Sequence, residues 1–115
     1  MAITPKSVAI IGQGYVGLPL AMAACRAGWS VTGIDVSKTI VQSLNIGVSH
    51  VEDVSDSELR QALDKGLYQA STSSELVSKS EIAIICVPTP LDEKGLPDLS
   101  YLESAVRQVA NHLPE

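Results

Sequence analysis

Residues 7–17 run Ser-Val-Ala-Ile-Ile-Gly-Gln-Gly-Tyr-Val-Gly, an apolar stretch that passes directly into closely spaced glycines. The apolar part, residues 7–11, predicts a buried strand. The glycines fit the pattern Gly-x-Gly-x-x-Gly, which is weak by itself because such triplets also arise by chance. Here a helical pattern follows, and an acidic residue, Asp35, closes the next apolar stretch. This context is typical of the phosphate-binding turn of a βαβ unit.

Each glycine of this turn has a separate physical task. Gly12 lets the chain turn sharply off the strand, Gly14 lets a pyrophosphate approach the backbone, and Gly17 lets the next helix pack closely on the sheet. The N-terminus of that helix then presents free N–H groups and a partial positive charge to the phosphates. The alternative interpretation is a tight glycine turn that binds no ligand.

Asp35 follows Gly17 by about 18 residues, close to the spacing expected for the carboxylate that binds the ribose of a dinucleotide. A carboxylate at this place accepts hydrogen bonds from both ribose hydroxyls and repels the additional phosphate of NADP, so it favours NAD. Lys38 would soften this preference. The structural alternative for Asp35 is a helix N-cap for the segment from Ser37, and the two roles are compatible.

Strand and helix patterns alternate along the whole chain, as in a parallel α/β sheet. Further strands are predicted at residues 30–34, 67–70 and 81–87. Ser/Thr-x-x-Glu spacing, typical of helix starts, occurs at 55–58, 72–75 and 100–103. Four strands in this sequence predict the first half of a Rossmann-type doubly wound parallel sheet with strand order 3-2-1-4. We therefore expect residues 1–115 to be an NAD-binding domain and a fragment of a longer protein.

Pro88-Thr89-Pro90 ends the predicted strand 81–87 at its carboxyl end, the edge where ligands bind in open α/β sheets. The prolines fix φ on both sides of Thr89, which keeps the only amide donor of the three and adds a hydroxyl. Such a rigid segment suits contact with a dinucleotide, and we expect Pro88 and Thr89 to lie at the cofactor. A plain strand terminator is the alternative.

The composition argues against other classes of function. The net charge is −5, so no basic stripe is available for a nucleic acid. The apolar runs are shorter than a bilayer requires. Cys25 and Cys86 lie in apolar stretches and lack the spacing of a metal site. We expect both to be reduced core residues of a cytoplasmic protein. His50 and His112 are isolated, which favours surface roles over metal binding or catalysis.

Several stretches taken together resemble the UDP-glucose/GDP-mannose dehydrogenases. They are Gly-Gln-Gly-Tyr-Val-Gly-Leu-Pro-Leu-Ala (12–21), Gly-Ile-Asp (33–35), Leu-Asn-Ile-Gly (44–47) and Ile-Cys-Val-Pro-Thr-Pro-Leu (85–91). Pro-Asp-Leu-Ser-Tyr (97–101) is most similar to the branch that oxidises UDP-N-acetylglucosamine or UDP-N-acetylmannosamine. The resemblance covers nearly the whole chain.

The resemblance implies an enzyme that oxidises the C6 hydroxyl of a UDP-sugar to a carboxylate with two NAD molecules in succession, for cell-surface polysaccharide biosynthesis. It implies that Tyr15 and Val16 contact NAD at the helix start, Asp35 at the ribose and Thr89 near the middle of the cofactor. The catalytic cysteine and lysine of the family belong to motifs that these residues do not contain. Ile40 departs from the family, since many members carry a basic residue near the adenosine.

The resemblance also implies a homo-oligomer for the full-length enzyme, with the UDP-sugar bound by other domains. Three alternatives stay open: a UDP-glucose 6-dehydrogenase of the same family, a β-hydroxyacid or 6-phosphogluconate-type dehydrogenase, and a stand-alone NAD-sensing regulatory module. The stretches 15–19 and 88–90 argue against the second. A natural stop codon near Glu115 would favour the third.

Overall fold

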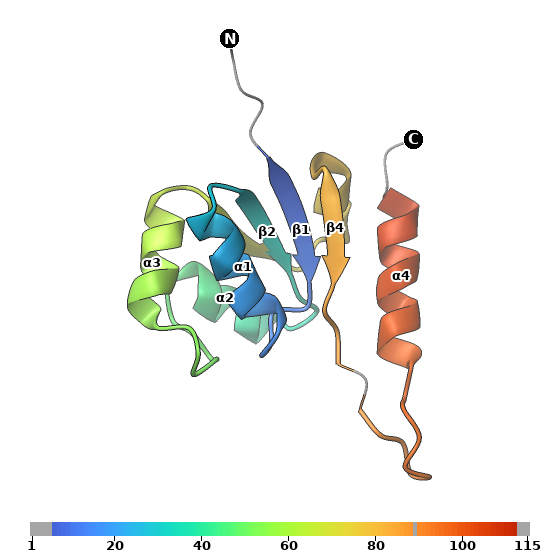
Figure 1. Cartoon of the computed structure of the whole chain (residues 1–115). Helices are drawn as coiled ribbons and strands as arrows, with labels where there is room; N and C mark the ends of the chain where they lie inside the picture. Colours follow the sequence, from blue (N-terminus) through green and yellow to red (C-terminus); the bar gives the residue numbers. More distant parts are fainter. Residues whose placement is uncertain (1–5, 89, 113–115) are drawn as a thin grey trace.

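The apolar stretches of the sequence form the strands of a parallel sheet, and helices connect them (Figure 1). The computed structural model describes residues 6–88 and 90–112. In chain order, its elements are β1 (Ser7–Ile11), α1 (Gly17–Arg26), β2 (Ser30–Ile34), α2 (Lys38–Asn45), α3 (Asp56–Asp64), β3 (Tyr68–Ser71), the 3-10 helix η1 (Ser74–Lys79), β4 (Ile82–Ile85) and α4 (Ser100–His112). None of the helices in this described part is long and apolar enough to cross a membrane.

The sheet has the strand order β3-β2-β1-β4, and every pair is parallel. This confirms the predicted order and the Rossmann-type fold. β1 lies between β2 and β4, with Ile10 opposite Gly33 on one side and Ile84 on the other. Because side chains alternate along a strand, β1 is buried on both faces, as its unbroken apolar sequence requires.

The helices cover the two faces of the sheet as separate layers. Val8 and Ile10 of β1 point into a core shared with α1, α2 and α3. Ala9 and Ile11 point the other way and pack with Val77 of η1 and with α4. Figure 1 shows α4 beside β4, on the opposite side of the sheet from α1 and α3. The crossover connections therefore change face after β3, which leaves a space at the carboxyl ends of β1 and β4.

Two of the helix starts are capped by serine side chains. Ser55 Oγ accepts a hydrogen bond from the amide of Glu58 at 3.1 Å, which confirms the predicted start of α3. Ser37 Oγ accepts one from the amide of Ile40 in the same way at α2. Both serines are in extended conformations, as N-caps require.

The other two predicted caps are wrong. Thr72 does not begin a helix, because Ser73 occupies the N-cap position of η1 and makes no side-chain cap. Ser100 is the first residue within α4, and its amide donates to Oδ1 of Asp98 at 2.9 Å. A carboxylate two residues upstream satisfies this amide and is favoured by the helix dipole, so the hydroxyl of Ser100 is not needed as a cap.

The outer edge of β3 is closed by a side chain. Asn45, the last residue of α2, donates from Nδ2 to the carbonyl of Ala70 at 2.9 Å and accepts from the amide of Ala70 at 2.9 Å. The amide group thus bonds to Ala70 as a neighbouring strand would. At the opposite edge, the only strand that pairs with β4 in the described part of the chain is β1, and Ile82 is half exposed there.

Candidate functional site

A cavity of about 540 Å³ opens where β1, β2 and β4 end. It lies at the point where the strand order reverses, the usual ligand position in open α/β sheets. Four segments line this cavity, which we call the cleft. They are 11–16 after β1, 34–36 with Ile40 and Thr72 beside β2, 86–88 after β4, and Tyr101, Ser104, Ala105 and Gln108 of α4.

Gly12 and Gly17 are required by the packing of the turn itself. Gly12 has a φ of +98°, and a Cβ there would overlap the carbonyl oxygen of Cys86. A Cβ at Gly17 would overlap the carbonyl oxygen of Gly12 and would lie 3.4 Å from Cβ of Cys86. The close approach at Gly17 is therefore mainly to the turn, and only secondarily to the segment that continues β4.

Gly14 is different, because nothing in the described structure requires a glycine at this position. Its φ lies outside the left-handed region, and a Cβ there would meet no atom within 4 Å. The backbone of Gly14 faces the cleft. A missing side chain that neither the conformation nor the packing explains fits a ligand that must come close to this backbone.

The N-terminus of α1 is open toward the cleft. Val16 is its N-cap and provides no side-chain hydrogen bond, whereas α2 and α3 each have a serine at this position. The first turn of α1 contains no acidic residue. Tyr15 and Val16, at this helix start, have 79% and 67% of their surface exposed. The uncapped amides and the helix dipole make this end suitable for an anion.

Asp35 is held in one orientation at the end of β2. Its Oδ2 accepts a hydrogen bond from the amide of Gln13 at 3.0 Å, and its Oδ1 accepts one from the amide of Ser37 at 3.0 Å. The alternative role as N-cap of α2 is not what the structure shows, because Ser37 is that N-cap. Each carboxylate oxygen keeps further acceptor capacity, which can face a pair of hydroxyls.

The segment after β4 contributes Cys86, Val87 and Pro88 to the cleft. Pro88 is exposed, opposite the turn that contains the glycines. The predicted cofactor residue Thr89 lies outside the residues that the structure describes.

The α4 wall of the cleft was not predicted from the sequence. Tyr101, Ser104, Ala105 and Gln108 line it at helical spacings of three, four and seven residues, which place them on one face. Three of these residues are polar or amphipathic, so a search for an apolar helix face would pass over them. The spacing alone would have identified the face, but not that it borders a cavity.

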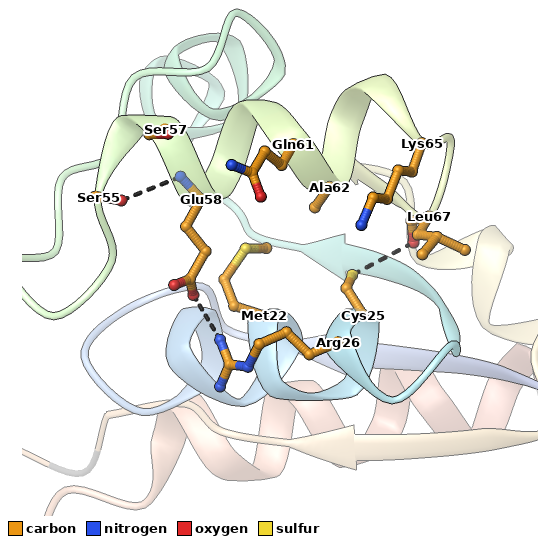
Figure 2. Close-up of a pocket in the computed structure, with 10 residues that line it drawn as sticks. All are labelled: Met22, Cys25, Arg26, Ser55, Ser57, Glu58, Gln61, Ala62, Lys65 and Leu67. Carbon is orange, nitrogen blue, oxygen red and sulfur yellow. Dashed lines mark hydrogen bonds and ion pairs between the residues drawn. The ribbon is translucent and has the colours of Figure 1, made fainter.

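A second, smaller cavity of about 260 Å³ lies between α1 and α3 (Figure 2). Figure 2 shows Met22 and Cys25 of α1 on the side that faces α3, and a dashed line that joins Arg26 to Glu58. This ion pair is 2.7 Å long. Cys25 Sγ donates to the carbonyl of Leu67 at 3.6 Å, and burial raises the pKa of its thiol to about 11. The thiol therefore stays protonated, as predicted for a core cysteine rather than a nucleophile.

The remaining chemical groups give no competing site. Cys86 is also a free thiol, and burial raises its pKa. In residues 6–88 and 90–112, no three His, Cys, Asp or Glu side chains stand close enough to hold a metal ion. The cleft thus remains the candidate site, with an uncapped helix start and an oriented carboxylate in one cavity.

Known proteins resemble this chain along nearly its whole length. Residues 6–115 match the NAD-binding domain of the UDP-glucose/GDP-mannose dehydrogenase family. The UDP-N-acetyl-D-mannosamine dehydrogenase of Pyrococcus horikoshii is 39% identical over 104 residues, which are 90% of this chain and 25% of the relative. The chain therefore spans about a quarter of the length of this relative.

Solved structures extend the likeness to the fold. A ternary complex of GDP-mannose dehydrogenase from Pseudomonas aeruginosa superimposes with a TM-score of 0.87 at 34% identity, over 91% of this chain and 24% of that one. A UDP-glucose dehydrogenase from Pyrobaculum islandicum gives a TM-score of 0.88 at 33% identity, over 95% and 26%. The three relatives are named for different nucleotide sugars, so one domain structure accompanies several substrates.

Proposed function

The chain belongs to the UDP-glucose/GDP-mannose dehydrogenase family as its NAD-binding domain, and we propose that the whole protein oxidises the C6 hydroxyl of a UDP-N-acetylhexosamine to the uronate. UDP-N-acetylmannosamine and UDP-N-acetylglucosamine are the candidate substrates. Two relatives named UDP-N-acetyl-D-mannosamine dehydrogenase, from Pyrococcus horikoshii and Escherichia coli, are 39% and 35% identical to this chain and support that choice. The product would serve cell-surface polysaccharide biosynthesis.

The observation that carries the cofactor role is Gly14, at which neither the backbone conformation nor the packing of the described residues requires a glycine. We propose that the pyrophosphate of NAD lies over this glycine, between Gly12 and Gly17. The amides at Tyr15 and Val16 would donate to its oxygens, because the start of α1 has no side-chain cap.

The other end of the cleft suits the adenosine. Asp35 would accept the ribose hydroxyls with a carboxylate that two backbone amides already orient. Val36 and Ile40 line the adjoining wall and bring no positive charge to a 2′-phosphate, so NADP would be disfavoured. Pro88 and Thr89 would contact the middle of the cofactor. When bound, NAD supplies the hydride acceptor of the reaction.

The cofactor site can be tested by calorimetric titration of the chain with NAD and NADP. Asp35→Ala should weaken NAD binding and reduce the preference over NADP, since both ribose acceptors and the repulsive charge are lost. Asp53→Ala, at an exposed aspartate away from the cleft, is the matched control and should bind NAD normally. Normal NAD binding by Asp35→Ala would contradict the assignment.

The substrate requires the longer protein. A full-length form should reduce two NAD per UDP-N-acetylmannosamine or UDP-N-acetylglucosamine, followed by NADH absorbance over a panel of nucleotide sugars. Turnover of UDP-glucose in preference to both would favour the alternative substrate within the same family. We also propose that the full-length enzyme is a homo-oligomer, which sedimentation of the same preparation would test.

A further inference from the structure

One polar side chain in the described part of the chain is buried completely, and it stands inside the glycine turn. Gln13 has an exposed fraction of 0%. Its Nε2 donates to the carbonyls of Ile10 and Gly12, both at 2.9 Å, and its Oε1 accepts from the hydroxyl of Tyr68 at 2.7 Å. The side chain therefore lies beneath the turn and is bonded to it through both donors.

Tyr68 comes from β3, two strands away from the turn, and is also buried. Burial raises the pKa of its hydroxyl, so it remains protonated and can only be the donor to Gln13 Oε1 in this pair. This bond fixes which end of the Gln13 amide faces the turn. Gly33 of β2, which lies between them, makes the contact possible, because a Cβ there would overlap Oε1 of Gln13 and lie 2.6 Å from the hydroxyl of Tyr68.

The backbone of Gln13 reaches the second part of the site. Its amide donates to Oδ2 of Asp35 at 3.0 Å. A single residue thus holds the carbonyl of Gly12 with its side chain and the carboxylate of Asp35 with its main chain. Neither Gln13 nor Tyr68 needs to touch the cofactor for this arrangement to matter.

We propose that Gln13 and Tyr68 are positioning residues, which hold the pyrophosphate turn and the Asp35 carboxylate in the relative placement that NAD binding needs. The inference rests on the proposed function, in which NAD occupies the cleft. Without the hydroxyl of Tyr68, Oε1 of Gln13 is left buried without a donor. Because an unpaired buried acceptor is unfavourable, we expect the side-chain amide to rotate or shift. Either movement changes the turn and the carboxylate together.

The experiment is a double-mutant cycle on the chain, with dissociation constants for NAD and for ADP-ribose measured by calorimetry. The variants are Tyr68→Phe, Gln13→Met and the two combined, with Val54→Ala as the control. Val54 is buried outside the cleft and makes none of the hydrogen bonds of this network, so its truncation lowers stability while leaving those bonds in place. Thermal unfolding of each variant sets a temperature at which all of them are folded.

Tyr68→Phe should weaken NAD binding roughly tenfold, the scale of one misplaced charge-assisted hydrogen bond. ADP-ribose should lose the same factor, because the nicotinamide is not involved. Since the hydroxyl acts only through Gln13, the combined variant should bind no more weakly than Gln13→Met alone. It should also unfold at a higher temperature than Gln13→Met, because no hydroxyl is then left unpaired, while its NAD affinity stays low.

Wild-type affinity in Tyr68→Phe, multiplicative losses in the combined variant, or an equal loss of affinity in Val54→Ala would each overturn the inference and leave the proposed function standing. Failure of the wild-type chain to bind either ligand would instead overturn the proposed function, and the inference with it. Tyr68→Phe alone suffices for the decision if Gln13→Met does not fold.

Discussion

Replacing Gly14 and Gly17 by alanine, one at a time, should separate what the ligand requires from what the fold requires. At Gly14 the new methyl group meets no described atom within 4 Å, and the backbone is already in a conformation that alanine adopts. Folding should therefore be unaffected, or stabilised by about 0.4–1 kcal/mol because alanine restricts the unfolded chain. At Gly17 the methyl group overlaps the Gly12 carbonyl oxygen, so the turn must move, at a cost of about 1–3 kcal/mol or more.

NAD affinity, measured on folded protein, should fall in Gly14→Ala even though its stability does not. The Gly14→Ala methyl group points into the space assigned to the pyrophosphate and would displace at least one hydrogen bond to a charged oxygen. Such a bond contributes about 1.5–3 kcal/mol, which corresponds to a loss of roughly ten- to a hundredfold in affinity. Ala23→Gly, on the exposed face of α1, controls for the general effect of exchanging these residues in this helix region.

The assay combines urea denaturation, for the free energy of unfolding, with calorimetric titration by NAD. A Gly14→Ala variant that is folded and stable but binds weakly is the expected result. The reasoning would be refuted if Gly14→Ala lost stability to the same extent as Gly17→Ala, or if it bound NAD as tightly as the wild type.

Two other predictions concern groups outside the cleft. Burial raises the pKa of Cys25 to about 11, so its alkylation by iodoacetamide near pH 8 should be far slower than that of a free thiol. The free energy of unfolding should also fall as the pH rises from 9.0, the ordinary pKa of a cysteine thiol, toward about 11, because the unfolded chain loses the proton first. Cys25→Ala should lessen that decline, and a decline of unchanged size in this variant would count against the assignment. Asn45→Leu removes both hydrogen bonds to Ala70 and should lower the free energy of unfolding in urea by about 1–2 kcal/mol, whereas Gln42→Leu, an exposed neighbour on α2, should not. Equal stability of these two leucine variants would show that the amide of Asn45 does not support the edge.

The strand order and the glycine turn could be predicted because they follow from local chemistry. An unbroken apolar stretch such as residues 7–11 has one stable place, inside a parallel sheet between two helix layers. The turn at Gly12 and the position of Asp35 could be predicted from short motifs in the same way. Gly12 has the positive φ of a sharp turn, and Asp35 lies beside that turn, where it accepts a hydrogen bond from Gln13. These features need no knowledge of distant contacts.

The features that were missed depend on partners far apart in the chain. Gln13 and Tyr68 are separated by 55 positions, and nothing near either residue indicates that they meet. A glutamine between two glycines suggests an exposed loop, yet it is fully buried here because three strands bring its partners together. The wrong caps at Thr72 and Ser100 have a different cause. The same four-residue spacing occurs at η1, whose N-cap position is Ser73, and at α4, where Asp98 bonds to the amide of Ser100. A short pattern cannot exclude such competitors.

The side-chain amide of Asn45 makes the two edges of the sheet unequal as places where a further strand could pair. At β3 the hydrogen-bonding positions of Ala70 are already occupied, so a further strand cannot join there without displacing a side chain. At β4 the comparable positions have no such occupant among the described residues. Among the described residues, the edge of β4 is therefore the less obstructed place for a further strand, and a strand added there would lengthen the sheet away from Asp35.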